Sequence, residues 1–124
     1  MERLASDRWR FALTNQLSIE SLKQVDQCFA RGRDPYGRAW ASKKKPSGPI
    51  LQKTGALRRS WIRSAVLPSA FRIESISPYA AAHQYGTQHI VPRAFIPYAL
   101  KGLGFIWSGA FEKIAVAVFR KALE

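Results

Sequence analysis

The sequence predicts an α+β domain in which a small antiparallel β-sheet packs against a long N-terminal helix and a C-terminal amphipathic helix. Three observations support this fold class. The first thirty residues contain no proline or glycine, two short segments rich in β-forming residues flank Pro68 and Ser69, and apolar residues near the C-terminus recur every three or four positions. At 124 residues, the chain is expected to form one domain, residues 1–124.

The N-terminal helix is expected over residues 1–30, with its clearest pattern from Leu4 to Ala30. Gly32 follows this stretch and can act as a stop signal. The apolar residues of the stretch are spaced three to five positions apart, which predicts one broad buried stripe. They are Trp9, Leu13, Leu17, Leu22, Val25 and Phe29.

A basic window follows this helix. Between Arg31 and Arg63 the sequence holds ten Lys and Arg residues against the single acid Asp34, so the window carries +9 of the net charge of +12. Prolines and glycines interrupt residues 31–53, which are therefore expected to form one long, basic, functional loop. The basic residues are Arg31, Arg33, Arg38, Lys43, Lys44, Lys45, Lys53, Arg58, Arg59 and Arg63.

A hairpin is expected in the first half of residues 54–100. It follows a single helical turn, for which Thr54 is a candidate N-cap. Its strands are residues 61–67 and 70–76, and in the second strand Phe71 and Ile73 alternate with charged residues, as in a half-buried strand.

Short elements are expected after the hairpin. Pro78 ends the second strand, and residues 79–85 suit a short helix that Gly86 can terminate. Two prolines favour extended chain over residues 90–97.

The C-terminal helix is expected within residues 105–124, with its regular pattern beginning near Ser108. Gly102 and Gly104 mark a loose connection before it. Most charged residues lie off its apolar stripe, which predicts an amphipathic helix. The stripe consists of Phe111, Ile114, Ala115, Val118, Phe119 and Ala122.

Composition narrows the class of protein. The chain has 20 Lys and Arg residues against 8 Asp and Glu residues, which favours an acidic partner. A single cysteine excludes an intramolecular disulfide framework and a cysteine-based zinc cage. The apolar stretches are too short to span a bilayer, and the first residues lack the apolar core of a signal peptide. We expect a soluble, basic protein of cytosolic type without membrane contact.

Catalytic patterns were tested and found incomplete. Residues 32–39 come near to a phosphate-binding loop, but Arg38 and Ala39 replace the required Lys and Ser or Thr, and Pro35 removes one N–H donor. Cys28 with His83 is better explained as a buried thiol and an unrelated histidine. His83 and His89 lie six residues apart, which does not suit two metal ligands on one helix face. We expect no enzyme activity, cofactor or metal.

Four segments, in order, resemble a known family. They read FARGRDPYGRAWA (residues 29–41), ILQKTGALRRS (50–60), YAAAHQYGT (79–87) and IVPRAFI (90–96). In order and spacing they are similar to the motifs of the tailed-phage virion morphogenesis, or tail completion, family, over about residues 29–100. Tyr36 and Ala94 depart from the family pattern, which has an acid and a proline there. A related head–tail joining family shares features near Gly86 and Phe95.

The resemblance implies a non-enzymatic virion component of the phage neck, assembled in the host cytoplasm. Such proteins cap the completed tail tube and join it to the head as a homo-oligomeric ring, for which a hexamer is expected. The expected partners are the tail tube, head-completion and neck proteins, with nonspecific contact to genomic DNA in the lumen. The motif residues with structural roles are Asp34, Pro35, Gly37, Trp40, Gly55, Leu57, Tyr79, His83, Gln84, Gly86, Pro92 and Phe95.

The basic window suggests where such a protein meets its partners. The candidate assembly contacts are Arg31, Arg33, Arg38, Lys43, Lys44, Lys45, Arg58 and Arg59. An acidic protein surface, passing DNA and plain solvation of the loop are the three alternatives for this window. A sequence-nonspecific nucleic-acid-binding module is the alternative function, because the net charge alone would attract phosphate.

Two hypotheses concern particular motif residues. Asp34 to Gly37 should form a turn that directs Trp40 into the core. His83 and Gln84 should be structural, with buried polar groups that tie their helix to the loop after Gly86. Metal binding at His83 is the competing hypothesis.

Overall fold

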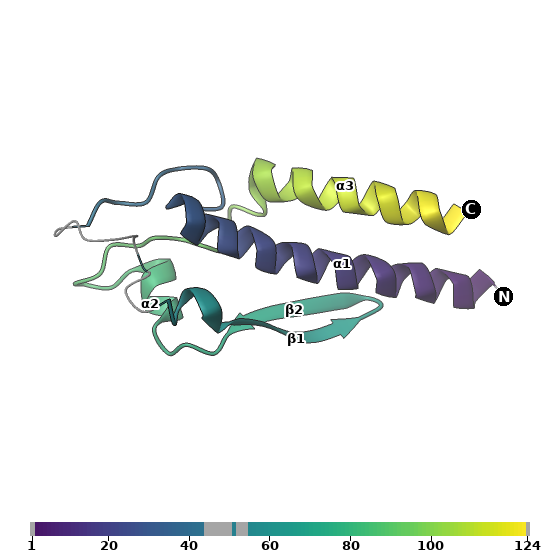
Figure 1. Cartoon of the computed structure of the whole chain (residues 1–124), viewed down its shortest axis with the longest axis horizontal. Coiled ribbons are helices and arrows are strands. Elements are labelled where there is room, and N and C mark those ends of the chain that lie inside the picture. The colour runs from purple at the N-terminus through teal and green to yellow at the C-terminus, as the bar shows by residue number, and fades with distance from the viewer. Residues whose placement is uncertain (1, 44–50, 52–54, 124) are drawn as a thin grey trace.

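The computed structural model describes residues 2–43, 51 and 55–123, and it confirms the predicted α+β class. A long helix, α1 (Glu2–Arg31), lies at the centre of an elongated molecule (Figure 1). The C-terminal helix α3 (Gly104–Leu123) lies beside α1 and runs antiparallel to it. The chain therefore leaves α1 at one end of the molecule and returns along it through α3.

The hairpin lies along the other side of α1 (Figure 1). Its strands are β1 (Trp61–Leu67) and β2 (Ala70–Ser75), paired antiparallel as predicted, and a 3-10 helix (Arg58–Ser60) leads into β1. The short helix α2 (Ala80–Tyr85) and the connecting loops gather at the end of the molecule that is far from both termini.

The C-terminal end of α1 is closed as the sequence predicts. Gly32 follows the helix with a φ of 63°, which side chains other than glycine rarely adopt. The N–H of Arg33 then donates to the carbonyl of Cys28 at 3.2 Å, which completes a Schellman-type cap.

The most buried line of α1 differs from the predicted stripe. Trp9, Leu13 and Leu17 are only half-buried. The line that the hairpin and α3 cover contains small polar residues in its N-terminal half, and these positions recur every three or four residues. It consists of Thr14, Ser18, Ser21, Val25 and Cys28.

The hydroxyl groups on this line all donate hydrogen bonds to backbone carbonyls. Thr14 donates from Oγ1 to the carbonyl of Leu67, at the end of β1, at 2.6 Å. Ser18 and Ser21 donate to carbonyls of the preceding helical turn, at 2.7 and 2.8 Å. Because their side chains are short, the neighbouring elements can approach α1 closely without leaving a buried polar group unpaired.

The hairpin has an inner and an outer face. Phe71 and Ile73 of β2 alternate with exposed residues and face the interior, as predicted. The pairing register shifts between Arg63 and Ala65, which indicates a β-bulge at Ser64. The inward-facing Arg63 donates from Nη1 to the side chain of Asn15 on α1 at 2.6 Å and so fixes the hairpin to the helix.

Helix α3 begins at Gly104, earlier than the regular pattern near Ser108 predicts. Gly104 has a φ of 76°, and an added Cβ would lie 2.5 Å from the ring of Tyr36. The first turn of α3 therefore packs closely against the turn that follows α1. Trp107 and Val118 are its buried residues, and Phe111 meets Phe71 of the hairpin edge to face.

The core is small and aromatic, and it lies towards the α2 end of the molecule. Phe29 stacks on Phe95 with ring centres 5.4 Å apart, Trp40 meets Phe29 edge to face at 5.5 Å, and Trp61 meets Phe95 in the same way at 5.5 Å. These rings come from four separate segments of the chain. Such pairs contribute about 0.5–1.5 kcal/mol each beyond the burial of their area, so this cluster fixes the segments relative to one another.

Candidate functional site

The motif segments that lie far apart in the sequence meet at the α2 end of the molecule. We call the contacts between residues 34–42 and residues 84–98 the motif junction. The first segment begins with the predicted turn: the N–H of Tyr36 donates to Oδ1 of Asp34 at 2.9 Å, and the N–H of Gly37 donates to the carbonyl of Asp34 at 3.0 Å. Pro35 is fully buried, and Gly37 has a φ of 88°. The turn hypothesis is therefore confirmed.

Trp40 lies in the core, as predicted. Only 6% of its surface is exposed. Its indole N–H donates to the carbonyl of Ala94 at 2.7 Å, so a single side chain contributes both packing and a long-range hydrogen bond to the motif junction. The bond joins residues 54 positions apart in the sequence.

Gln84 is the central polar residue of the motif junction and is 2% exposed. Its Nε2 donates to the carbonyl of Ile96 at 2.8 Å. Its Oε1 accepts the N–H groups of Phe95 and Ile96, at 2.9 and 3.2 Å. The buried amide thus replaces a strand partner for residues 95–96, which confirms that Gln84 ties α2 to the following loop.

Gly86 allows this loop to turn back on α2. Its φ is 79°, and an added Cβ would lie 2.8 Å from Cδ of Pro92 and 2.9 Å from the carbonyl oxygen of Ile90. Glycine is therefore required both by the backbone conformation and by the space. The N–H of Gly86 caps α2 by donating to the carbonyl of Ala82 at 2.8 Å.

Arg93 is a motif-junction residue that the sequence reasoning missed. Its Nε and Nη2 donate to the carbonyls of Ala41 and Ser42, at 2.9 and 3.1 Å. The sequence contains one clue to this role. Arg93 lies two positions before the buried Phe95, and a charged residue so close to the core is expected at its edge, where its charge can find a partner. Its partners are carbonyls, so the charge serves to hold the chain after Trp40 in place.

The structure supports only part of the hypothesis that His83 is a structural residue with a hydrogen-bonded side chain. Its carbonyl accepts the N–H of Arg93 at 2.8 Å, which supports a structural role. Its buried Nδ1, however, makes no hydrogen bond within the described residues, so the expected pairing of the imidazole is wrong. Burial, and then the nearby Arg93 guanidinium, lower the pKa of His83, which favours the neutral ring. Tyr79 before it is largely exposed rather than packed on the core.

Tyrosines surround the outer side of the motif junction. The hydroxyl of Tyr36 donates to the carbonyl of Gly102 at 2.8 Å and accepts the N–H of Tyr98 at 2.9 Å, and the two rings stack with centres 6.4 Å apart. Lys101 places its Nζ 5.0 Å from the centre of the Tyr36 ring. Tyr36 departs from the family pattern, and its contacts connect the turn after α1 to the start of α3.

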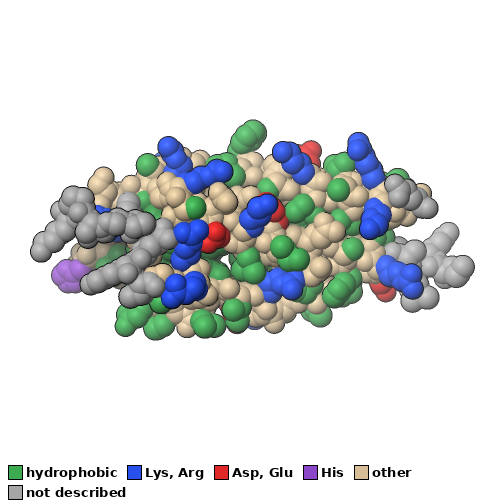
Figure 2. All heavy atoms as spheres, in the orientation of Figure 1, with side chains coloured by type: hydrophobic (Ala, Val, Ile, Leu, Met, Phe, Trp, Pro, Cys, Tyr) green, Lys and Arg blue, Asp and Glu red, His purple; other side chains and the backbone are tan. Residues whose placement is uncertain are grey.

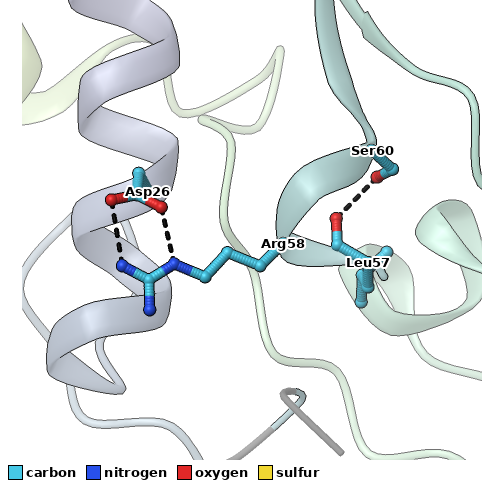
Figure 3. A network of polar contacts seen from close by, with 4 residues as sticks. All are labelled: Asp26, Leu57, Arg58 and Ser60. Atoms are coloured by element: carbon cyan, nitrogen blue, oxygen red, sulfur yellow. Dashed lines mark hydrogen bonds and ion pairs between the residues drawn. The ribbon is translucent and has the colours of Figure 1, made fainter. Parts of the chain in front are cut away.

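The remaining motif residues support the entry to β1. Gly55 has a φ of 74°, and its carbonyl accepts the N–H of Arg59 at 3.1 Å. Leu57 packs against the core, and its carbonyl accepts the hydroxyl of Ser60 at 2.6 Å (Figure 3). Thr54, which was the expected N-cap of this turn, lies outside the described residues.

Two of the described candidate assembly contacts make hydrogen bonds within the chain. Arg58 makes a two-pronged ion pair with Asp26 of α1, with N–O distances of 2.6 and 2.9 Å (Figure 3). This hydrogen bond lowers the pKa of Asp26. Arg58 therefore links the 3-10 helix to α1, and its expected role as an assembly contact stays a prediction. Arg33 donates to the carbonyl of Gly37 at 2.9 Å.

The other basic residues of the window differ in what the structure shows. Arg31, Arg38 and Arg59 are exposed, at the end of α1, in the turn and in the 3-10 helix, respectively. Lys43 is half-buried, whereas Lys44, Lys45 and Lys53 lie outside the described residues. The described part of the expected loop, residues 32–43, contains the turn and the Trp40 anchor and forms one isolated bridge between Arg33 and Ala39.

The described residues contain no group of three or more His, Cys, Asp or Glu side chains that could hold a metal ion. Cys28 is buried as predicted, and burial, with a smaller contribution from Asp34, raises the pKa of its thiol to about 12. The thiol is therefore protonated and a poor nucleophile near neutral pH. None of the helices in the described part of the chain is long and apolar enough to cross a membrane.

A small hollow lies beside Cys28, between the end of α1 and the start of α3. Arg31, Arg33, Asp34 and Trp107 are among the residues that line it. Its volume of about 30 Å³ has room for a few water molecules, whereas ligand pockets usually measure about 300–1,000 Å³. The hollow therefore does not suggest a small-molecule substrate.

The outer surface is large and carries many exposed apolar side chains. The chain exposes 8891 Å², whereas a compact monomer of 14.0 kDa exposes about 6,700 Å². Fifteen large hydrophobic residues in the described part are exposed, including Phe105 at 93%. Figure 2 shows hydrophobic side chains along the upper edge of the molecule, over α3, and along the lower edge, on the side of the hairpin. Surfaces of this kind mark sites of protein association.

The sequence was compared with known proteins. The family model described as the phage virion morphogenesis family matches residues 3–100, which include all four motif segments and end before α3. No curated protein and no solved structure matches the chain.

Proposed function

The chain belongs to the phage virion morphogenesis family, and from this premise we propose that it is a structural neck protein that completes the tail and joins it to the head. Membership makes the chain a component of phage virion assembly. The proposal adds its position at the junction of tail and head, with a stage in the host cytoplasm before incorporation.

One observation carries the proposal: the motif residues are used for architecture. Trp40, Gln84 and Gly86 are occupied by core packing and backbone hydrogen bonds inside the chain. A chain whose motif residues build a rigid scaffold, with many exposed apolar side chains around it, is suited to assembly rather than to catalysis.

We further propose that the protein acts as a homo-oligomeric ring, with a hexamer as the expected state, between the tail tube and the head-completion proteins. An elongated subunit that exposes about a third more area than a compact monomer has surface available for more than one neighbour. Basic residues in the window from Arg31 to Arg63 would then contact acidic surface on a neighbouring subunit or neck protein.

Nonspecific DNA binding is the second candidate, and the net charge of +12 is the observation that favours it. It fits the neck as well, because genomic DNA passes through the lumen of such a ring. As an independent function it predicts a monomer that binds any duplex with strong salt dependence.

Joining of heads to tails in vitro tests the proposal. A phage that encodes this chain, with the gene deleted, should accumulate separate DNA-filled heads and tails, and the purified protein should restore infectious particles when it is added to the lysate. Electron microscopy should show the added protein at the tail end that meets the head. Restoration by an unrelated basic protein of the same charge, or separate heads and tails that persist after addition, would contradict it.

A further inference from the structure

We propose that copies of this chain contact one another head to tail, with the outer stripe of α3 in one copy packed against the outer face of the hairpin in the next. The inference rests on the proposed ring, for which it names the two contact surfaces. The outer stripe and the outer face are both made of described residues, and they lie on different elements of the chain.

The outer stripe runs the length of α3. Its members recur every three or four positions, so they lie on one side of the helix. Phe105 is 93% exposed and Leu123 is 74% exposed. Trp107, Phe111 and Val118 pack towards the interior from the other side of α3. The outer stripe consists of Phe105, Gly109, Glu112, Val116, Phe119 and Leu123. Phe119 lies at its edge: it is 52% exposed, and its ring also meets Trp9 of α1 with ring centres 6.2 Å apart.

The outer face of the hairpin has a matching character. Cross-strand pairs place Ile62 opposite Glu74, Ala65 opposite Arg72, and Leu67 opposite Ala70. All six side chains are exposed. An apolar face with one acid and one base is therefore presented on the side of the sheet that points away from α1.

The positions of the two surfaces determine the kind of contact. α3 and the hairpin flank α1 in Figure 1 and touch where Phe111 meets Phe71. The outer stripe and the outer face lie on the sides of these elements away from that contact, so one copy can contact two neighbours at once. A contact between two different surfaces of the same chain is heterologous. It propagates from copy to copy and forms a ring when the rotation closes.

Charge favours a second copy over DNA as the occupant. Glu112 lies in the middle of the outer stripe, and Arg72 and Glu74 lie in the middle of the outer face; none of the three makes an ion pair within the described residues. Head-to-tail packing can pair Glu112 with Arg72, and Lys113, at the edge of the outer stripe, with Glu74. Each surface carries one acid beside one base, so neither offers phosphate the cluster of positive charge that DNA binding requires.

The chain exposes more area than a compact monomer of its mass. Two interfaces of ordinary size, each burying about 800 Å² on each copy, would cover most of this excess area.

Charge reversal with rescue tests the contact. Glu112→Arg and Arg72→Glu should each weaken self-association in sedimentation velocity at micromolar concentration by about 30-fold or more, because each places like charges opposite one another. The double variant carries both changes in every copy and should restore assembly. Lys23→Glu, an exposed position on α1, is the control for a change of net charge and should assemble as the unchanged protein does. Circular dichroism checks that each variant folds.

The outcomes separate this inference from the proposed ring. Single variants that assemble normally, or a double variant that stays dissociated, would show that the two surfaces do not meet, while rings of the unchanged protein would still support the proposed function. An unchanged protein that stays monomeric at high concentration and yet restores head–tail joining would overturn both the contact and the ring.

Discussion

At the scale of single residues, Gln84 joins α2 to residues 95–96 through three hydrogen bonds. We expect Gln84→Ala to lower the free energy of unfolding by about 3 kcal/mol or more, since it leaves a cavity and several buried backbone groups without partners. Urea denaturation measures the change. Gln16→Ala, at an exposed position of α1, is the matched control and should change stability by less than about 0.5 kcal/mol. Equal effects of the two substitutions would refute the central role of Gln84.

His83 should make stability depend on pH. Its pKa is lowered from 6.5 in the folded chain, so below pH 6.5 the unfolded chain binds a proton that the folded chain does not. Stability is therefore fully present above this pH and declines as the pH falls towards the folded pKa. Urea denaturation at pH 7.5, 6.5 and 5.5 should show this decline, and His83→Gln should reduce it. His89→Gln, at an exposed position, keeps His83 and should retain the decline.

At the scale of elements, the end of α2 depends on Gly86. Gly86→Ala should destabilise the protein by about 2 kcal/mol or more, because the added Cβ meets Pro92 and the carbonyl of Ile90 in a backbone conformation that alanine disfavours. Gly109→Ala is the matched control. Gly109 lies inside α3 with no atom within 4 Å of an added Cβ, so alanine should raise the stability of the monomer by about 0.5–1 kcal/mol. Thermal unfolding of both variants gives the comparison.

The basic run of Lys43, Lys44 and Lys45 is expected to contact an acidic neighbour during assembly. Changing all three to Glu should block the joining of heads to tails and leave the melting temperature of the isolated protein within a few degrees. Three substitutions to Gln give the control that removes charge without reversing it, and joining should then be only partly reduced. Normal necks with the Glu variant would show that these lysines are only solvated.

At the scale of the whole molecule, salt should act in opposite directions on the two candidate functions. Copies that each carry +12 repel one another, so raising the salt from about 0.05 to 0.5 M should strengthen an apolar self-association by screening the repulsion. Nonspecific DNA binding should weaken steeply over the same range, because it is driven by counterion release. Sedimentation with and without a short duplex measures both. The apolar contact and the screened repulsion should outweigh the weakening of the few ion pairs at the contact, so self-association that disappears as salt rises would contradict the proposed packing.

The sequence by itself determined the features that depend on neighbouring residues. The absence of Pro and Gly before Gly32 determined α1, the β-forming segments around Pro68 determined the hairpin, and Asp34 to Gly37 determined a turn. Helix caps and turns are closed by hydrogen bonds within a few residues, and apolar periodicity identifies the side of an element that seeks cover. These signals predicted the fold class and the turn after α1, whereas most motif-junction residues were named through the family resemblance.

Only the tertiary structure decided which surfaces meet. In the structure, the most buried side of α1 runs through Thr14, Ser18 and Ser21 rather than along the predicted apolar stripe. The hairpin and α3 approach α1 closest there, because these side chains are short and donate to backbone carbonyls. Arg58 forms an ion pair with Asp26, and Arg93 donates hydrogen bonds to the carbonyls of the two residues after Trp40. Such partners lie tens of residues apart, and sequence spacing carries no information about which distant donor reaches which acceptor until the chain has packed.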